Sequence, residues 1–313
     1  TVGGLVNVID NKIPTQMPEN GYEGQVGLRY NTGSDEKLAS AGVTVGLGSQ
    51  VALRVEGLTR DANNYIAPNY IHEGEKERRV DNTFAQGDSV NVGLSWIYDR
   101  GYTGISYSNR RDQYGLPGHS HEYESCSAHL GGRPHLHCDP HEHEHEDGEE
   151  AHDHEHEEHE HEHGGPWIDL KSERYDFKTE LNDPFAGFQK LRAQASYTDY
   201  QHDEIEEGAI ATRFQNKGYD GRIELVHNPI ADWEGVIGTQ LGQQKLNLTG
   251  EEAFMAPTTT KKWSVFALEH KQWKDVHFEL SARADQQEID VDDNSKQDFD
   301  GSAFSYAGAA NWE

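Results

Sequence analysis

Histidine and acidic residues alternate in one segment of this chain, between residues 119 and 163. The segment holds 14 of the 19 histidines, and its densest runs read HEHEHE at 141–146, HDHEH at 152–156 and HEHEH at 159–163. Neutral imidazole and carboxylate are ligands for borderline divalent cations, above all Zn²⁺. The segment therefore predicts many weak, interchangeable sites for transition-metal ions.

Two parts of this segment differ in how well they are prepared to bind a metal. In an extended chain His119 and His121 point the same way, so they can chelate one ion. Glu122 would be either a third ligand or a hydrogen-bond partner of one of the ligands. The tract 141–163 has almost no apolar residue, and we expect it to be disordered without metal and to capture ions at high capacity and modest affinity. The alternatives are a solvated loop for the first part and an acidic spacer for the second.

The candidate metal ligands are mostly histidines of this segment. They are His119, His121, Glu122, His129, His135, His137, His141, His143, His145, His152, His154, His156, His159, His161 and His163. A later polar stretch supplies auxiliary candidates, for which a solvated loop tip is an equally good interpretation. They are His202, Asp203, Glu204, Glu206 and Glu207. Because unperturbed histidine titrates near pH ~6.5, we expect zinc capture to weaken steeply below that pH.

Both cysteines, Cys126 and Cys138, lie in the same segment. In an oxidising compartment they would form a disulfide, which would fix the stem near His129, His135 and His137 and leave the following tract as a mobile arm. The alternative is a pair of thiolate metal ligands. We favour the disulfide because the rest of the chain has the character of an extracytoplasmic protein.

The composition narrows the class of protein. The chain of 313 residues has a net charge of -29, 34% hydrophobic residues and a mean hydropathy of -0.90. Nucleic acid needs a basic footprint, so we expect no nucleic-acid partner, whereas a negative field concentrates cations. A soluble domain carries about 45–50% apolar residues, so this chain is either extensively disordered or a barrel whose strands are apolar on one face. An aromatic content of 10% and regular strand patterns favour the barrel.

The sequence shows no motif for catalysis or for a membrane-spanning helix. It has no Gly-x-Ser-x-Gly motif, no P-loop and no dinucleotide-binding fingerprint, so we expect no enzyme. It also lacks an apolar run of about 20 residues, the length of a transmembrane helix. Four histidines are isolated in the sequence and receive no predicted role: His72, His227, His270 and His277.

Apolar and polar residues alternate along much of the chain with the period of two that marks β-strands. The alternation is clear at 51–56, 90–96 and 276–281. We predict twelve strands, at 21–30, 39–48, 50–60, 87–98, 101–111, 167–181, 188–200, 218–227, 232–246, 261–270, 275–290 and 301–312. Several reach about 10 residues, the length that spans a membrane when the strand is tilted.

The predicted connections alternate strictly between short and long. Short turns are expected at 48–50, 99–101, 183–187, 228–231 and 271–274, and long connections at 31–38, 61–86, 112–166, 201–217, 247–260 and 291–300. Tight turns on one side and long loops on the other are typical of an outer-membrane barrel. A soluble sandwich or propeller has no reason to place every long loop on one side.

The two faces of the predicted strands also differ. In strand 87–98 the lipid-facing set is Val90, Val92, Leu94 and Trp96, and the lumen-facing set is Asn91, Gly93 and Ser95. Strand 275–290 alternates in the same way, and aromatic residues near strand ends predict interfacial girdles. We therefore predict an all-β, antiparallel transmembrane β-barrel with about 12 strands here. Because the last strand stops at Glu313 with no turn after it, we expect a portion of a larger barrel.

Three parts of the sequence resemble TonB-dependent outer-membrane receptors, and among them the zinc-uptake receptors. Residues 2–9, VGGLVNVI, resemble the end of the plug domain where it leads into the first barrel strand. Residues 108–124, SNRRDQYGLPGHSHEYE, resemble the zinc receptors over their whole length. Residues 165–170 and 199–204 resemble the strands that follow the His-rich external loop. The resemblance extends from one end of the chain to the other.

This resemblance implies a barrel of about 22 strands that is plugged by an N-terminal domain. Residues 1–18 would then be the end of the plug and a linker. Residues 19–313 would be a partial barrel, with 112–166 as its metal-binding loop. The family's high-affinity zinc ligands in the plug and the later barrel have no counterparts in this sequence.

The function implied by the resemblance is active import of Zn²⁺ across the bacterial outer membrane. Its partners would be zinc ions, outer-membrane lipid and the TonB complex, which is engaged through an N-terminal region missing here. One alternative is a haem or siderophore receptor of the same family, since haem iron accepts histidine as an axial ligand. Another is a surface protein that sequesters zinc without transport.

Overall fold

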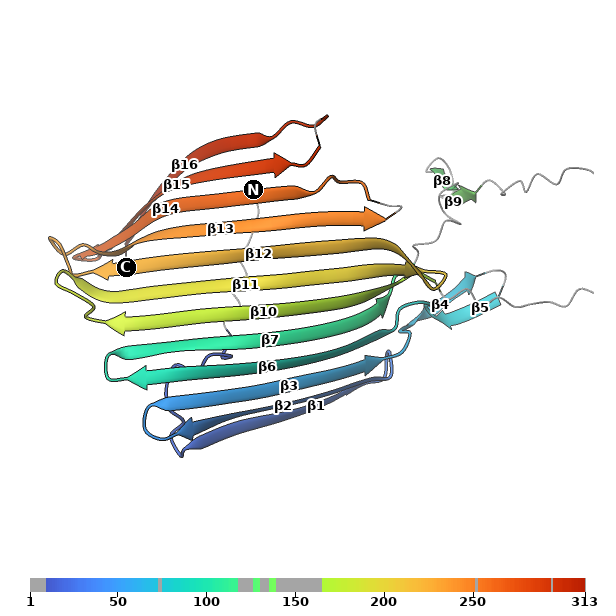
Figure 1. Cartoon of the computed structure of the whole chain (residues 1–313), viewed down its shortest axis with the longest axis horizontal. Coiled ribbons are helices and arrows are strands. Elements are labelled where there is room, and N and C mark those ends of the chain that lie inside the picture. The colour runs from blue at the N-terminus through green and yellow to red at the C-terminus, as the bar shows by residue number, and fades with distance from the viewer. Residues whose placement is uncertain are drawn as a thin grey trace, which may run out of the picture.

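The computed structural model describes residues 10–72, 75–117, 126–129, 135–138, 165–250, 253–293 and 295–312. Within these residues, no helix is long and apolar enough to cross a membrane. Twelve of the described strands form one antiparallel sheet, in which neighbours in space are neighbours in the chain once two small hairpins are set aside (Figure 1). These strands are β1 (Tyr22–Asn31), β2 (Glu36–Leu47), β3 (Val51–Ala62), β6 (Ala85–Tyr98), β7 (Gly101–Gly115), β10 (Trp167–Asn182), β11 (Phe188–Glu206), β12 (Ala209–His227), β13 (Glu234–Gly250), β14 (Thr258–Trp273), β15 (Val276–Val291) and β16 (Phe299–Trp312).

Two hairpins lie outside the main sheet. β4 (Ile66–His72) pairs with β5 (Glu75–Arg79), and β8 (Cys126–His129) pairs with β9 (His135–Cys138). Both belong to connections at the same end of the sheet (Figure 1). We call this the loop end, and we call the opposite end, where β2–β3, β6–β7, β10–β11, β12–β13 and β14–β15 are joined, the turn end.

All twelve predicted strands are present, but the prediction of a long connection at 201–217 is wrong. β11 continues to Glu206 and β12 begins at Ala209, so only Glu207 and Gly208 join them. Both have positive φ angles, 48° and 79°, as a two-residue type I′ hairpin turn requires. The predicted connection 31–38 likewise shrinks to 32–35. The strict alternation of short and long connections therefore fails at these two hairpins.

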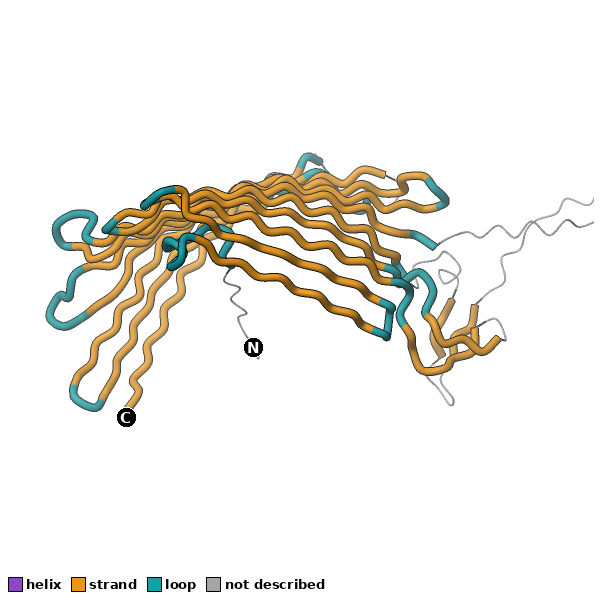
Figure 2. Tube along the Cα trace, turned by 90° about the horizontal axis from the view of Figure 1, so that it is seen from below, coloured by secondary structure: helices purple, strands orange, loops and turns teal. Residues whose placement is uncertain are grey.

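The sheet is curved, with one concave and one convex face (Figure 2). On β6, Val90 and Trp96 are 50% and 55% exposed on the outer face, whereas Ser95 on the concave face is 1% exposed. This confirms the predicted separation of apolar and polar faces in strand 87–98. A face of exposed apolar side chains suits contact with lipid, and a polar concave face suits a water-accessible lumen.

Four tyrosines form a row across the outer face. Tyr107, Tyr175, Tyr197 and Tyr219 lie directly opposite one another on β7, β10, β11 and β12. The Tyr107 and Tyr175 ring centroids are 5.1 Å apart. From Tyr197 to Phe188 at the turn end, β11 covers roughly 30 Å, or roughly 21–25 Å along a membrane normal at a tilt of 35–45°. That height matches the apolar band of an outer-membrane barrel.

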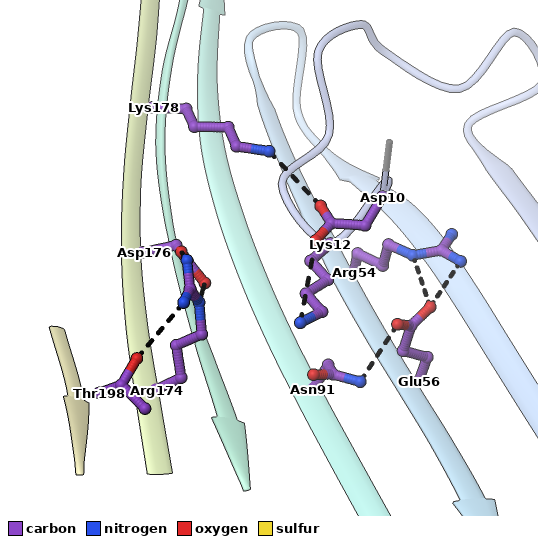
Figure 3. A network of polar contacts seen from close by, with 9 residues as sticks. All are labelled: Asp10, Lys12, Arg54, Glu56, Asn91, Arg174, Asp176, Lys178 and Thr198. Carbon is purple, nitrogen blue, oxygen red and sulfur yellow. Dashed lines mark hydrogen bonds and ion pairs between the residues drawn. The ribbon is translucent and has the colours of Figure 1, made fainter. Parts of the chain in front are cut away.

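The described chain begins with a segment that crosses the concave face before β1. Ile13 is buried there, and the Lys178 ammonium lies 3.4 Å from the Asp10 carboxylate (Figure 3). The crossing needs two glycines beneath it. A Cβ at Gly93 would overlap the Lys12 carbonyl, and one at Gly104 would overlap the Ile13 side chain.

Candidate metal-binding sites

The predicted His-rich segment leaves the sheet at the loop end, between β7 and β10. Most of its predicted ligands lie outside the described residues: His119, His121, Glu122, His141, His143, His145, His152, His154, His156, His159, His161 and His163. His129, His135 and His137 belong to β8 and β9. This hairpin places His129 opposite His135 in the backbone register.

The same register places Cys126 opposite Cys138. Directly opposite residues of antiparallel strands have Cα atoms about 4.5–5.5 Å apart, within the range of about 4.4–6.8 Å that disulfides span. The disulfide stays a prediction, and this backbone pairing is compatible with it.

Asn82, which no sequence pattern singles out, joins the two stems of the His-rich loop. Its side-chain amide donates hydrogen bonds to the carbonyl oxygens of Leu116 and Pro166, at 3.1 Å and 2.6 Å. The stems also bond to each other, from the Leu116 amide to the Pro166 carbonyl at 2.9 Å. A Cβ at Gly115 would overlap the Asn82 carbonyl oxygen, so the approach is close. The loop therefore begins and ends at one fixed point.

The auxiliary candidates lie at the loop end of β11, beyond the tyrosine row and outside the apolar band. His202 and Glu204 share the face of Tyr200, which lines the concave side. The His202 ring stacks on Phe214 with centroids 4.3 Å apart, and its Nδ1 lies 2.9 Å from the Tyr200 hydroxyl. Burial lowers the pKa of His202 because the charged imidazolium loses hydration, and so keeps the ring neutral.

Asp203 points to the outer face, where its carboxylate is paired with an arginine. Arg213 donates two hydrogen bonds to its carboxylate, at 2.7 Å and 2.8 Å. The Arg213 guanidinium holds the pKa of Asp203 below its usual value. A metal ion would have to displace this arginine to use both carboxylate oxygens.

The auxiliary cluster is therefore divided between two faces. Glu206 ends β11 and Glu207 occupies the turn that follows. Across the part of the chain that the structure describes, no three imidazole, thiol or carboxylate groups already converge on one point. Metal binding by the auxiliary candidates stays a prediction, and it would need side chains to rearrange.

The concave wall carries a repeated ion pair between residues two apart on one strand. The pairs are Arg54–Glu56 on β3 at 2.8 Å, Arg174–Asp176 on β10 at 2.7 Å, Arg222–Glu224 on β12 at 2.6 Å and Arg283–Asp285 on β15 at 2.8 Å (the first two in Figure 3). An Arg-x-Asp or Arg-x-Glu pattern within a predicted strand could have identified these pairs, because residues two apart in a strand place both charges on one face. Each pair cancels its own charge, so the wall is polar without a large field.

A trough of about 460 Å³ lies along this wall between β10 and β15. Its polar lining includes Arg174, Tyr200, Gln240, Lys262 and Arg283. Lys262 makes no ion pair with any described residue. Ligand sites typically occupy about 300–1,000 Å³, so the trough is large enough for a hydrated ion or a small chelate.

Solved structures of metal and siderophore transporters are similar to this chain. The FrpB iron transporter from Neisseria meningitidis (F3-3 variant) matches with a TM-score of 0.65 and 9% identity, over 94% of this chain and 44% of that one. The copper transporter OprC matches with a TM-score of 0.60 and 8% identity, over 93% and 41%. The siderophore receptor PiuA from Acinetobacter baumannii matches with a TM-score of 0.55 and 11% identity, over 92% and 46%.

No family model matches the chain. The chain spans less than half the length of these three proteins. At such low identity the similarity establishes the fold alone. The described sheet shares its fold with part of each of these solved structures, which confirms the predicted all-β antiparallel architecture.

Proposed function

We propose that this chain is part of a TonB-dependent zinc receptor of the bacterial outer membrane. The His-rich loop captures Zn²⁺ outside the cell and delivers it to the concave face, which is the lumen of the barrel. The observation that carries the proposal is the position of the His-rich loop. Its stems at Leu116 and Pro166 are joined by Asn82 at the loop end of a sheet whose outer face is apolar and whose inner face is polar.

The segment before β1 supports the domain organisation that we propose. Residues 1–18 form the end of a plug and its linker, and residues 19–313 form the partial barrel with the metal-binding loop. A plug must enter the barrel lumen, and the described residues from Asp10 onward lie on the concave face beside β6 and β7. Coupling to TonB would use residues that precede this segment.

Zinc is the proposed cargo because of the donor set. Alternating imidazole and carboxylate groups suit Zn²⁺, whereas a siderophore site depends more on aromatic and arginine-lined walls. The solved structures with the same fold include copper, iron and siderophore transporters, so the fold does not select the metal. A haem receptor and a protein that only sequesters zinc remain the alternatives to test.

Calorimetric titration of the purified chain with Zn²⁺, Ni²⁺, Cu²⁺ and haem tests the capture step. We expect several equivalents of zinc to bind the parent chain and most of them to be lost when residues 139–163 are deleted. A matched variant replaces every histidine of 141–163 with glutamine and keeps all carboxylates. It should lose zinc as the deletion does, because an acidic spacer alone has no imidazole ligands.

Two results would contradict the proposal. Zinc binding that survives in the glutamine variant would show that the histidines of the tract are not the ligands. If it also survived the deletion, the tract would be an acidic spacer. Tight haem binding that the deletion leaves unchanged would favour the haem receptor. Uptake is tested separately, by growth of zinc-starved cells that carry the whole receptor with and without the tract. If the chain binds zinc but the tract does not affect growth, a protein that only sequesters zinc would be favoured.

A further inference from the structure

Two histidines and two glutamates gather at the turn end of the concave face, although they are scattered in the sequence. Glu234 pairs with His270, and His270 pairs with Glu279, so these three form a row across β13, β14 and β15. His277 lies two residues before Glu279 on the same face of β15. We call these four residues the rim cluster.

The rim cluster faces the lumen side of the sheet. On β15, Glu279 belongs to the same alternation as Arg283 and Asp285, which line the trough. β14 and β15 each have 16 residues, which corresponds to about 50 Å. The cluster therefore lies at the opposite end of the lumen from the His-rich loop.

The distances place a carboxylate beside each imidazole. His270 Nε2 is 3.7 Å from a Glu234 oxygen, and His277 Nε2 is 3.3 Å from a Glu279 oxygen. The two imidazole centroids are 5.8 Å apart. Two imidazoles on one tetrahedral zinc, with Zn–N distances of about 2.0–2.1 Å, have centroids roughly 5 Å apart. The observed separation is within about 1 Å of this value, and the rings would also have to rotate so that one nitrogen of each faces the ion.

A hydrogen bond prepares His277 for a cation. Its Nδ1 lies 3.1 Å from the Gln272 side-chain oxygen, which can only accept, so Nδ1 carries the proton. The Nε2 lone pair then faces the Glu279 carboxylate, and this arrangement is repulsive unless a proton or a metal ion lies between them. A hydrogen bond from the second ring nitrogen is the usual way in which proteins orient a metal-bound histidine.

We propose that the rim cluster binds one divalent transition-metal ion, with Zn²⁺ as the best match to two imidazoles and one or two carboxylates. His270 and His277 supply the nitrogen ligands, and Glu234 and Glu279 supply the oxygen ligands. The four side chains are 31–55% exposed, so rotation about their own bonds can bring them together. The proposal does not rest on the proposed function, because binding at the rim requires no uptake.

The test uses a variant without the ligands of the His-rich loop. The Leu116 amide already bonds the Pro166 carbonyl, so residues 118–164 can be replaced by a short glycine-serine turn. Co²⁺ is titrated into this tag-free protein in detergent, and the visible absorption of tetrahedral cobalt is followed. We expect one saturable equivalent that Zn²⁺ displaces. His270→Gln and His277→Gln should each weaken binding by at least about tenfold.

His227→Gln is the matched control. His227 lies at the same end of the sheet and is also paired with a carboxylate, Glu269, at 3.0 Å, but this pair lies on the outer face. Its loss should leave cobalt binding unchanged. Binding that is equally weak in the control, or equally strong in His270→Gln and His277→Gln, would overturn the proposal, as would the absence of a saturable equivalent. A β-sheet circular dichroism spectrum confirms that each variant is folded.

Discussion

The imidazole of His202 is partly shielded from water and stacks on Phe214, and this burial determines how the group responds to pH. Because its pKa is lowered in the folded protein, protonation disfavours the packed state. The stability that neutral His202 contributes is complete above the ordinary pKa of about 6.5 and is lost as the pH falls below it. We therefore expect the ring to titrate below 6.5 when its signals are followed by NMR.

Phe214→Ala should raise the pKa of His202 toward its ordinary value, because the substitution opens the ring to water. The same NMR titration measures the change, and Asn247→Ala, which lies on the outer face of the neighbouring strand, is the control. An unchanged titration in Phe214→Ala would show that another contact lowers the pKa.

Residue types in the sequence identified His202 and Asp203 as candidate metal ligands. They did not identify the neighbouring side chains that bury the imidazole of His202 and pair with the carboxylate of Asp203. Phe214 and Arg213 belong to the stretch 201–217, whose polar sequence predicts a loop. His270 received no role, because Glu234 and Glu279 are distant from it in sequence and meet it only through strand register. His277 received none because the same register is needed to place it beside His270. A cross-strand contact cannot be read from one strand alone, since it depends on where the neighbouring strand begins.

Asn82, in the segment before β6, positions the two stems of the His-rich loop. It adopts φ 54°, which asparagine tolerates better than alanine, and its amide bonds both stems of the His-rich loop. Asn82→Ala should therefore loosen the stems, at a local cost of about 1–3 kcal/mol. Hydrogen exchange at the Leu116 amide measures this, and we expect exchange to be faster.

Two further variants separate the causes. Asn82→Gly keeps the positive φ but removes the amide, so it should exchange nearly as fast as the alanine variant. Asn91→Ala removes an amide that bonds Glu56 on the concave wall, far from the loop, and should leave Leu116 unchanged. Slow exchange at Leu116 in both Asn82 variants would mean that the stems are held without this side chain.

At the level of elements, the period-two pattern was sufficient to find every strand of the main sheet. It failed where β11 and β12 extend beyond the tyrosine row, because the outer face of these strands becomes polar there and the alternation with the concave face is lost. In the register of β11 and β12, Gln201 pairs with Gln215 and Asp203 pairs with Arg213. The alternation depends on lipid contact on one side, so it disappears where the strand leaves the apolar band.

At the scale of the whole molecule, the sheet has an apolar outer face and a polar concave face. A pair of lysine substitutions can test whether lipid covers the outer face. Val265 is exposed on the outer face between Trp263 and the turn end, within the apolar band. Gln240 lies at nearly the same height on the concave face and bonds Asp220. The two positions differ mainly in whether lipid or water surrounds the side chain.

Val265→Lys should destabilise the protein in lipid vesicles by about 2–4 kcal/mol, because a charge near the bilayer midplane loses its hydration. Gln240→Lys should change stability by no more than about 1 kcal/mol, since the new ammonium remains in water and can pair with Asp220. Denaturant unfolding in vesicles measures both values. Equal effects of the two substitutions would mean that the apolar face packs against protein rather than lipid. The outer-membrane location would then fail, whatever metal the loop binds.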